Sequence, residues 1–224
     1  MGDSFAGTKM IRRNDMEIAP SAVRSDAAAY VLRQLSAESE FAEFAAARRR
    51  GYRQLEIATN DGPLDAVRRF ATTLGVFAGG AIVGGISMWR LSQGFCSVGY
   101  LLGGAGIERF PADRVIEIGA LFVVPEHRGV GLSRSLLEAA RAQLADMAPA
   151  LVVSFAREAE AERYVRDWGF RAVGPAAAHP FSPAVRVVPL AASLRAVLRG
   201  AAREATRPRL VQPISVESMS GGNE

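Results

Sequence analysis

The sequence predicts an α+β fold in which a central, mostly antiparallel sheet is flanked by helices. Two observations lead to this prediction. Apolar runs with the composition of strands follow one another in the middle of the chain, at about 72–78, 82–89 and 115–124. Segments with apolar residues at spacings of three and four, which are typical of helices, precede and follow them. The chain has 224 residues, enough for one domain of about 150–180 residues with extensions but not for two full domains.

The first third of the chain predicts helices. Residues 1–20 have little periodicity, and we expect a loosely ordered extension. The apolar spacing then predicts two helices, over about 23–35 and 36–50. No strand is evident before residue 72, and residues 16–18 are a poor candidate for one.

Two uncharged stretches, 71–89 and 91–107, are long enough to raise the question of a membrane span. Glycines divide the first stretch into pieces of strand length, and Gly79-Gly80 is a pair that hairpin turns use. We therefore expect two paired strands, with a further strand at 95–102, instead of a transmembrane hairpin.

The most informative segment joins the predicted strand at 115–124 to a helix running from Gly129 to Met147. The first amides of a helix have no partner inside it, and together with the helix dipole they favour an anion such as pyrophosphate. Gly129 and Gly131 permit positive φ and a close approach of the ligand to the backbone. Arg128 can add a charge-assisted hydrogen bond. These residues predict a phosphate-bearing ligand.

Several elements follow this helix. They are a buried strand at 151–155, a helix at 158–168, a strand from 169 to 173, a proline-containing loop to 183 and a last strand at 185–190. Residues 191–205 alternate Leu and Val with Arg, as a basic amphipathic helix does, and we expect this helix to dock on its own domain, with a membrane surface or a partner as the alternative. The composition of 206–224 is that of a flexible tail.

The segment Val123 to Ser133, VVPEHRGVGLS, resembles the acetyl-CoA signature of the GNAT N-acetyltransferase superfamily. That pattern is Arg or Gln, two residues, Gly, one residue, then Gly or Ala, and it departs here only at Ser133, which is small. The order of predicted elements matches the superfamily over about 25–190, so we assign 21–190 as the acyltransferase domain. The resemblance implies the GNAT fold and an N-acetyltransferase that moves acetyl from acetyl-CoA to a primary amine by direct attack, without a metal.

The resemblance also implies roles for individual residues. The strand residues Leu121, Phe122 and Val123 are expected to meet the pantetheine. The residues expected to hold the pyrophosphate are Arg128, Gly129, Val130, Gly131, Leu132 and Ser133.

Glu117 is the best candidate for the general base. It lies eleven residues before Arg128, the offset at which some members of the superfamily carry a catalytic glutamate. The even spacing between Glu117 and Val123 predicts that both side chains lie on one face of the strand. Its apolar neighbours Ile116 and Ile118 would partly desolvate the carboxylate, which favours proton uptake. The alternative is a strand glutamate paired with an arginine.

Tyr164 is the candidate general acid. The superfamily often has a tyrosine before its second Gly-Phe, and residues 161–170 resemble that segment. Aligned on Gly169-Phe170, the usual tyrosine position is Val165, so Tyr164 stands one residue early and a packing role is the alternative.

Composition excludes several other classes. The chain has 26 arginines and one lysine, and the arginines are spread along it, which argues against a nucleic-acid-binding stripe and fits a GC-rich bacterial genome. Cys96 is the only cysteine, so no intrachain disulfide and no Cys-based zinc site can form. The N-terminus lacks the apolar core of a signal peptide, and a cytoplasmic protein is expected.

Two other functions stay open. The run from Phe44 to Leu55, FAAARRRGYRQL, together with the signature, resembles the branch of the superfamily that makes N-acyl amino acids or autoinducers from long-chain acyl-CoA or acyl carrier protein. In that case the triple Arg48-Arg49-Arg50 could dock an acidic carrier. A non-catalytic CoA-binding sensor is the other alternative. The sequence leaves the acceptor and the oligomeric state open, a homodimer included.

Overall fold

The computed structural model describes residues 29–53, 55, 57, 70–93, 109–179, 182–205 and 214–216. Within these residues nine strands form one sheet, in the order β6-β8-β5-β4-β3-β2-β1-β9, with β7 paired to β8. The strands are β1 (Tyr30–Gln34), β2 (Thr72–Ala78), β3 (Ala81–Arg90), β4 (Val115–Val123), β5 (Leu151–Arg157), β6 (Arg171–Ala172), β7 (Ala177–His179), β8 (Ser182–Ala192) and β9 (Ile214–Val216). The α-helices are α1 (Glu38–Arg53), α4 (Leu132–Met147), α5 (Glu158–Trp168) and α6 (Leu194–Ala205).

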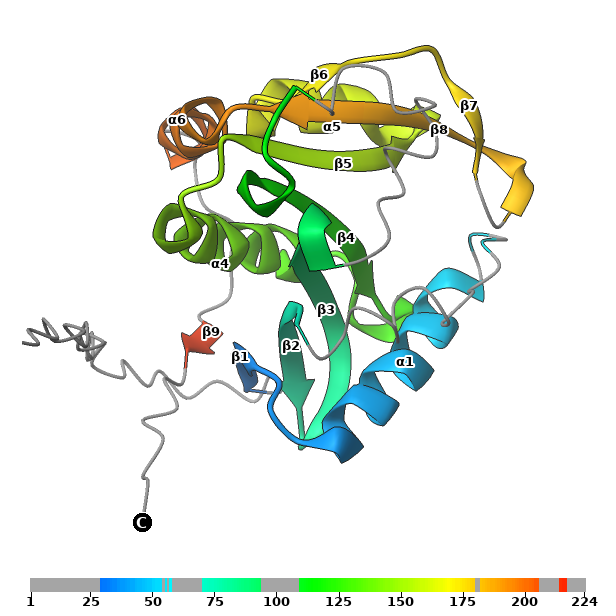
Figure 1. Ribbon diagram of the computed structural model, residues 1–224. Helices are drawn as coiled ribbons and strands as arrows, with labels where there is room; N and C mark the ends of the chain where they lie inside the picture. The colour runs from blue at the N-terminus through cyan, green and yellow to red at the C-terminus, as the bar shows by residue number, and fades with distance from the viewer. Residues whose placement is uncertain are drawn as a thin grey trace, which may run out of the picture.

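The sheet is mostly antiparallel, which confirms the predicted fold class. β1 to β4 pair antiparallel in sequence order, and β5 pairs antiparallel with β8. β4 and β5 are parallel because α4 carries the chain back between them (Figure 1). β9 also runs parallel, beside β1.

Helices α1 and α4 cover opposite faces of the sheet, as two neighbouring glycines of β3 show. A Cβ atom on Gly84 would lie 3.5 Å from Leu136 of α4, whereas one on Gly85 would clash with the ring of Phe44 of α1. Successive residues of a strand face opposite sides, so the two helices lie on either side of β3.

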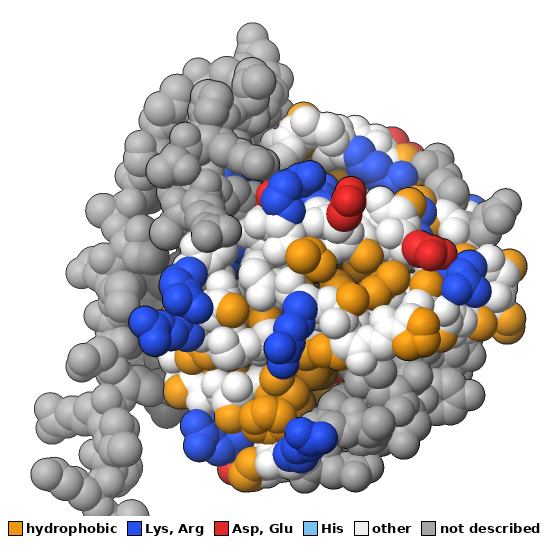
Figure 2. Space-filling model, turned by 90° about the horizontal axis from the view of Figure 1, so that it is seen from above, with side chains coloured by type: hydrophobic (Ala, Val, Ile, Leu, Met, Phe, Trp, Pro, Cys, Tyr) orange, Lys and Arg blue, Asp and Glu red, His pale blue; other side chains and the backbone are white. Residues whose placement is uncertain are grey.

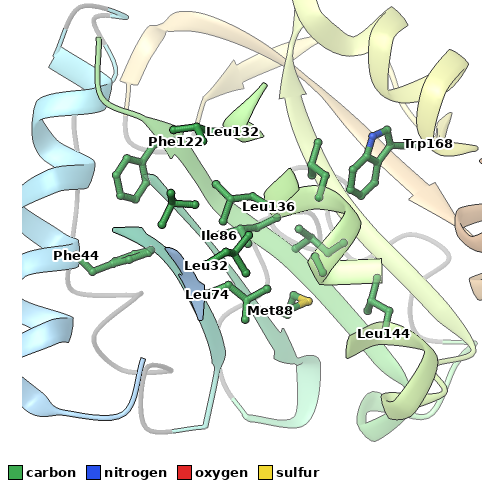
Figure 3. Close-up of a cluster of buried hydrophobic side chains, with 14 of the residues drawn as sticks. Leu32, Phe44, Leu74, Ile86, Met88, Phe122, Leu132, Leu136, Leu144 and Trp168 are labelled. Atoms are coloured by element: carbon green, nitrogen blue, oxygen red, sulfur yellow. The ribbon is translucent and has the colours of Figure 1, made fainter. Parts of the chain in front are cut away.

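The apolar core fills the space between these helices and the sheet (Figure 3). Ile86, Leu136 and Leu144 are fully buried, and each such side chain contributes about 1.5–3 kcal/mol. On the α5 side, Trp168 closes the same cluster.

The structure corrects the start of the chain. Residues 30–34 form strand β1, not the end of a helix, and pair with β2 in the register Tyr30↔Ala78. Tyr30 and Leu32 are buried on alternate positions, as in a strand. The second predicted helix is confirmed as α1, and at its start Glu40 Oε2 accepts hydrogen bonds from the backbone N–H groups of Ser36 and Ala37, at 2.8 and 3.1 Å.

Most other predicted elements are confirmed. β2 and β3 form a hairpin whose turn residues Gly79 and Gly80 have φ of +58° and +85°. α5 spans the predicted residues. The expected loop before residue 183 contains the short strand β7, because Ala177 and Ala178 pair with β8. The predicted strand at 95–102 lies outside the described residues.

Helix α6 docks on its own domain, as expected. Val197 is fully buried, and Gly200 packs so closely on the end of α5 that a Cβ atom there would lie 2.9 Å from the carbonyl oxygen of Asp167. Residues 214–216, within the segment predicted as a tail, form β9. Of the helices that the structure describes, none is both long and apolar enough for a membrane span.

Candidate active site

Strands β4 and β5 separate after three paired positions. Their register runs from Val115↔Leu151 to Glu117↔Val153, and just beyond it the hydroxyl of Ser154 donates to the carbonyl oxygen of Ile118 at 2.9 Å. A side chain thus takes the place of the next ladder bond. Ala120 has a φ of +54°, and the register between β3 and β4 shifts at this point, so β4 carries a bulge that turns it away from β5.

Beyond the bulge, one edge of β4 faces an open gap. The N–H of Val124 donates to Val83 of β3 at 2.9 Å, so by alternation Val123 and Leu121 face away from β3. The carbonyl oxygens of both residues are occupied, because the Tyr52 hydroxyl donates to Leu121 and Arg128 Nε donates to Val123, each at 3.0 Å. Among the described residues, the backbone N–H groups of Leu121 and Val123 are therefore the polar groups that this edge presents to a ligand.

A cavity of about 340 Å³ occupies the gap. It is lined from both faces of the sheet, by the end of α1 on one side and by α4 and α5 on the other. The residues are Gly51, Tyr52, Leu55, Leu121, Phe122, Val123, Arg128, Gly129, Gly131, Leu132, Ser133, Leu137, Arg157, Glu160, Arg163, Tyr164 and Trp168. Eight of the nine predicted donor-binding residues line it, and Val130, the ninth, packs on the core instead.

The glycine-rich turn has the backbone that the sequence predicts. Gly129 and Gly131 have φ of +84° and +90°, and Gly131 is the N-cap of α4. A Cβ atom on Gly129 would meet nothing within 4 Å, so the space over this residue is free for a ligand. Gly131 has no side chain that could bond to the first amides of the helix, which suits these amides to an anion.

Arg128 lies at the cavity but makes contacts that the sequence does not predict. Its guanidinium donates to two backbone carbonyl oxygens, Val123 through Nε at 3.0 Å and Gly51 through Nη2 at 2.7 Å. These bonds tie the turn to the end of β4 and to the last turn of α1.

Glu117 does not line the cavity, and the prediction that it shares a face with Val123 is wrong. Glu117 pairs with Trp89, on the α1 face, whereas Val123 pairs with Gly84, on the α4 face. The bulge adds one residue to β4 between them, and one extra residue reverses the alternation. Glu117 is 1% exposed.

Tyr164 lines the cavity, whereas the family position, Val165, is 43% exposed on the outside of α5. The one-residue shift noted in the sequence therefore brings the tyrosine to the site. Burial raises the pKa of Tyr164 above its ordinary value of 10, and the nearby Glu160 carboxylate raises it further. The phenol is consequently protonated at neutral pH.

The cavity also contains residues that the sequence analysis missed. Tyr52, at the end of α1, is half-buried, and the burial of its phenol raises the pKa to about 12, although the positive charge of Arg48 opposes the shift. The other missed residues are Arg157, which ends β5 and is the N-cap of α5, and Glu160 and Arg163 of α5. With Tyr164 they recur at spacings of three and four, so one face of the helix lines the site. The spacing of these residues is visible in the sequence, but it identifies site residues only when the structure shows that this helix faces the gap.

The chain shares its fold, a mostly antiparallel sheet flanked by helices, with a solved N-acyltransferase. The model of the acetyltransferase (GNAT) family matches residues 32–173, and the chain belongs to this family of acyltransferases. No curated protein matches the sequence.

Solved structures have the same fold at low sequence identity. FeeM, an N-acyl amino acid synthase from uncultured soil microbes, is 17% identical with a TM-score of 0.65, over 77% of this chain and 94% of that one. The AHL synthase LasI is 15% identical with a TM-score of 0.57, over 77% and 96%. An acyl-CoA N-acyltransferase from Pseudomonas aeruginosa is 13% identical with a TM-score of 0.56, over 75% and 100%.

Proposed function

We propose that this protein is a cytoplasmic N-acetyltransferase that moves the acetyl group of acetyl-CoA, its acyl-donor substrate, to a primary amine. The observation that carries the proposal is the gap between β4 and β5. One edge of the gap offers the N–H groups of Leu121 and Val123, which suit the amide and thioester carbonyls of an acyl-pantetheine chain. The free start of α4 lies beside it and suits the pyrophosphate.

The transfer needs a proton acceptor for the amine and a proton donor for the departing thiolate. The amine nitrogen attacks the thioester carbon, the new C–N bond forms and the C–S bond breaks. Tyr164 supplies the proton to the sulfur, since burial keeps its phenol protonated. Glu117 accepts the proton of the amine. A water molecule must relay this proton, because Glu117 is 1% exposed and does not line the cavity.

The test is a calorimetric titration of the purified chain with acetyl-CoA, followed by a thiol-release assay with a panel of primary amines. Saturable binding and amine-dependent thiol release support the proposal. Binding with no turnover for any amine would favour a CoA-binding sensor, and no binding at all would overturn the donor assignment.

A second candidate is an acyltransferase that resembles the N-acyl amino acid synthases and takes a long acyl chain from CoA or from acyl carrier protein. The apolar part of the cavity wall favours it, with Leu55, Leu132, Leu137 and Trp168 available to pack on a chain. The fold similarity to FeeM is consistent with it.

The surface expected to dock a carrier is smaller than the sequence predicts. Arg48 is 7% exposed within α1, so Arg49 and Arg50 are the exposed members of the triple. A series of acyl-CoA donors of increasing chain length, with charged acyl carrier protein as a further donor, separates the two enzymes. A kcat/KM that rises with chain length or with the carrier would replace the acetyltransferase assignment.

A further inference from the structure

Arg128, the charged residue of the glycine-rich turn, already forms hydrogen bonds within the protein. Arg128 donates to the carbonyl oxygens of Val123 and Gly51, which belong to different elements, β4 and α1. Turning this guanidinium toward a phosphate would break both charge-assisted bonds and leave two carbonyl oxygens to be satisfied again. Arg128 therefore fits the role of a clasp that holds the gap edge beside α1.

The other two arginines of the cavity wall are Arg157, the N-cap of α5, and Arg163, within that helix. Arg157 forms an ion pair with Glu160, one turn further along the helix. Arg163 is exposed, and within the part of the chain that the structure describes it makes no hydrogen bond or ion pair. Its guanidinium is thus available to a ligand without the loss of an existing contact.

Arg163 lines the same cavity as Gly129, Gly131 and Ser133, the residues at the start of α4. The α5 wall and the glycine-rich turn thus face one ligand space, with the free amides of the turn on one side and a positive charge on the other. On the face shown in Figure 2, Lys and Arg side chains are spread among hydrophobic and uncharged surface, some of them next to one another, so basic side chains are not confined to the cavity.

We propose that Arg163, and not Arg128, is the side chain that binds a phosphate of the acyl donor, an inference that rests on the proposed use of acetyl-CoA. Guanidinium forks match phosphate oxygens in a bidentate manner, and an exposed arginine can follow a phosphate that sits at the mouth of a cavity.

The experiment compares Arg163→Gln with Arg166→Gln. Arg166 lies on the same helix, is exposed, pairs with Asp167 and does not line the cavity, so it is a matched control for the loss of one charge. Both variants are titrated with CoA and with S-acetylpantetheine, which lacks the nucleotide phosphates. We expect Arg163→Gln to bind CoA about tenfold more weakly, with a shallower salt dependence, and S-acetylpantetheine as the unchanged protein does. Arg166→Gln should leave both affinities unchanged.

Arg128→Gln completes the comparison. It should lower the urea midpoint because it removes the clasp, whereas Arg163→Gln should not. Unchanged CoA affinity in Arg163→Gln would overturn the inference, and so would a rise confined to the KM of the acceptor amine. Failure of the unchanged protein to bind CoA would instead overturn the proposed function itself, so the two failures are distinguishable.

Discussion

The phenol of Tyr52 donates a hydrogen bond of 3.0 Å to the carbonyl oxygen of Leu121, although the two residues are 69 positions apart in the sequence. This bond joins the end of α1 to the edge of β4 just after its bulge. Together with the bonds from Ser154 to Ile118 and from Arg128 to Val123, it satisfies carbonyl oxygens that the separation from β5 removes from the ladder. The gap is thus built by three side chains from three different segments.

Tyr52→Phe removes the first of these bonds and keeps the ring. We expect the free energy of unfolding to fall by about 0.5–1.5 kcal/mol in urea titrations, and acetyl-CoA affinity to fall with it because the gap edge loses its support. Tyr30→Phe is the control, since its hydroxyl also bonds a distant residue, His127 at 3.0 Å, but does not line the cavity. Equal acetyl-CoA affinities in the two variants would mean that Tyr52 has no part in the site.

Glu117→Gln keeps the shape of the buried side chain and removes its basicity. Under the proposed mechanism kcat should fall about 10²–10⁴-fold while the Kd of acetyl-CoA stays constant, measured by thiol release and calorimetry. Glu138→Gln, an exposed glutamate on α4, controls for the change in net charge. Full activity in Glu117→Gln would assign the base elsewhere.

Tyr164→Phe tests the general acid. We expect kcat to fall tenfold or more, and the ratio of kcat between the unchanged protein and the variant to stay constant from pH 7 to about pH 10. The reason is that burial raises the pKa of Tyr164 above its ordinary value of 10, so the proton is present at lower pH and is lost only as the pH rises through the raised pKa. A ratio that falls between pH 7 and 9 contradicts this role.

The parts of the site that depend on local signals could be predicted from the sequence. The turn into α4 forms as expected, with positive φ at Gly129 and Gly131. It could be predicted because both the glycine conformations and the helical spacing after them depend on residues that are neighbours in the sequence. β1 was missed because its short apolar run, Tyr30 to Leu32, is ambiguous between helix and strand, and because its partner strand β2 lies about 45 residues further along the chain.

The relative orientation of the Glu117 and Val123 side chains also depends on contacts between distant segments, so the sequence alone did not predict it. Alternation predicts one face for both, but the bulge at Ala120 reverses it. Nothing in the sequence near Ala120 announces the bulge, because the groups that satisfy the released carbonyls, Tyr52 and Ser154 among them, come from distant segments.

The most direct test of an acyl-donor site at the start of α4 compares Gly129→Ala with Gly80→Ala. Both glycines have φ near +85°, and at both a Cβ atom would meet nothing within 4 Å, so the two substitutions carry the same backbone strain of about 1–2 kcal/mol. Gly80 lies in the β2–β3 turn, away from the cavity. Calorimetric titration with acetyl-CoA should show at least tenfold weaker binding for Gly129→Ala and unchanged binding for Gly80→Ala. Equal affinities would contradict a donor phosphate at this turn, and with it the proposed function.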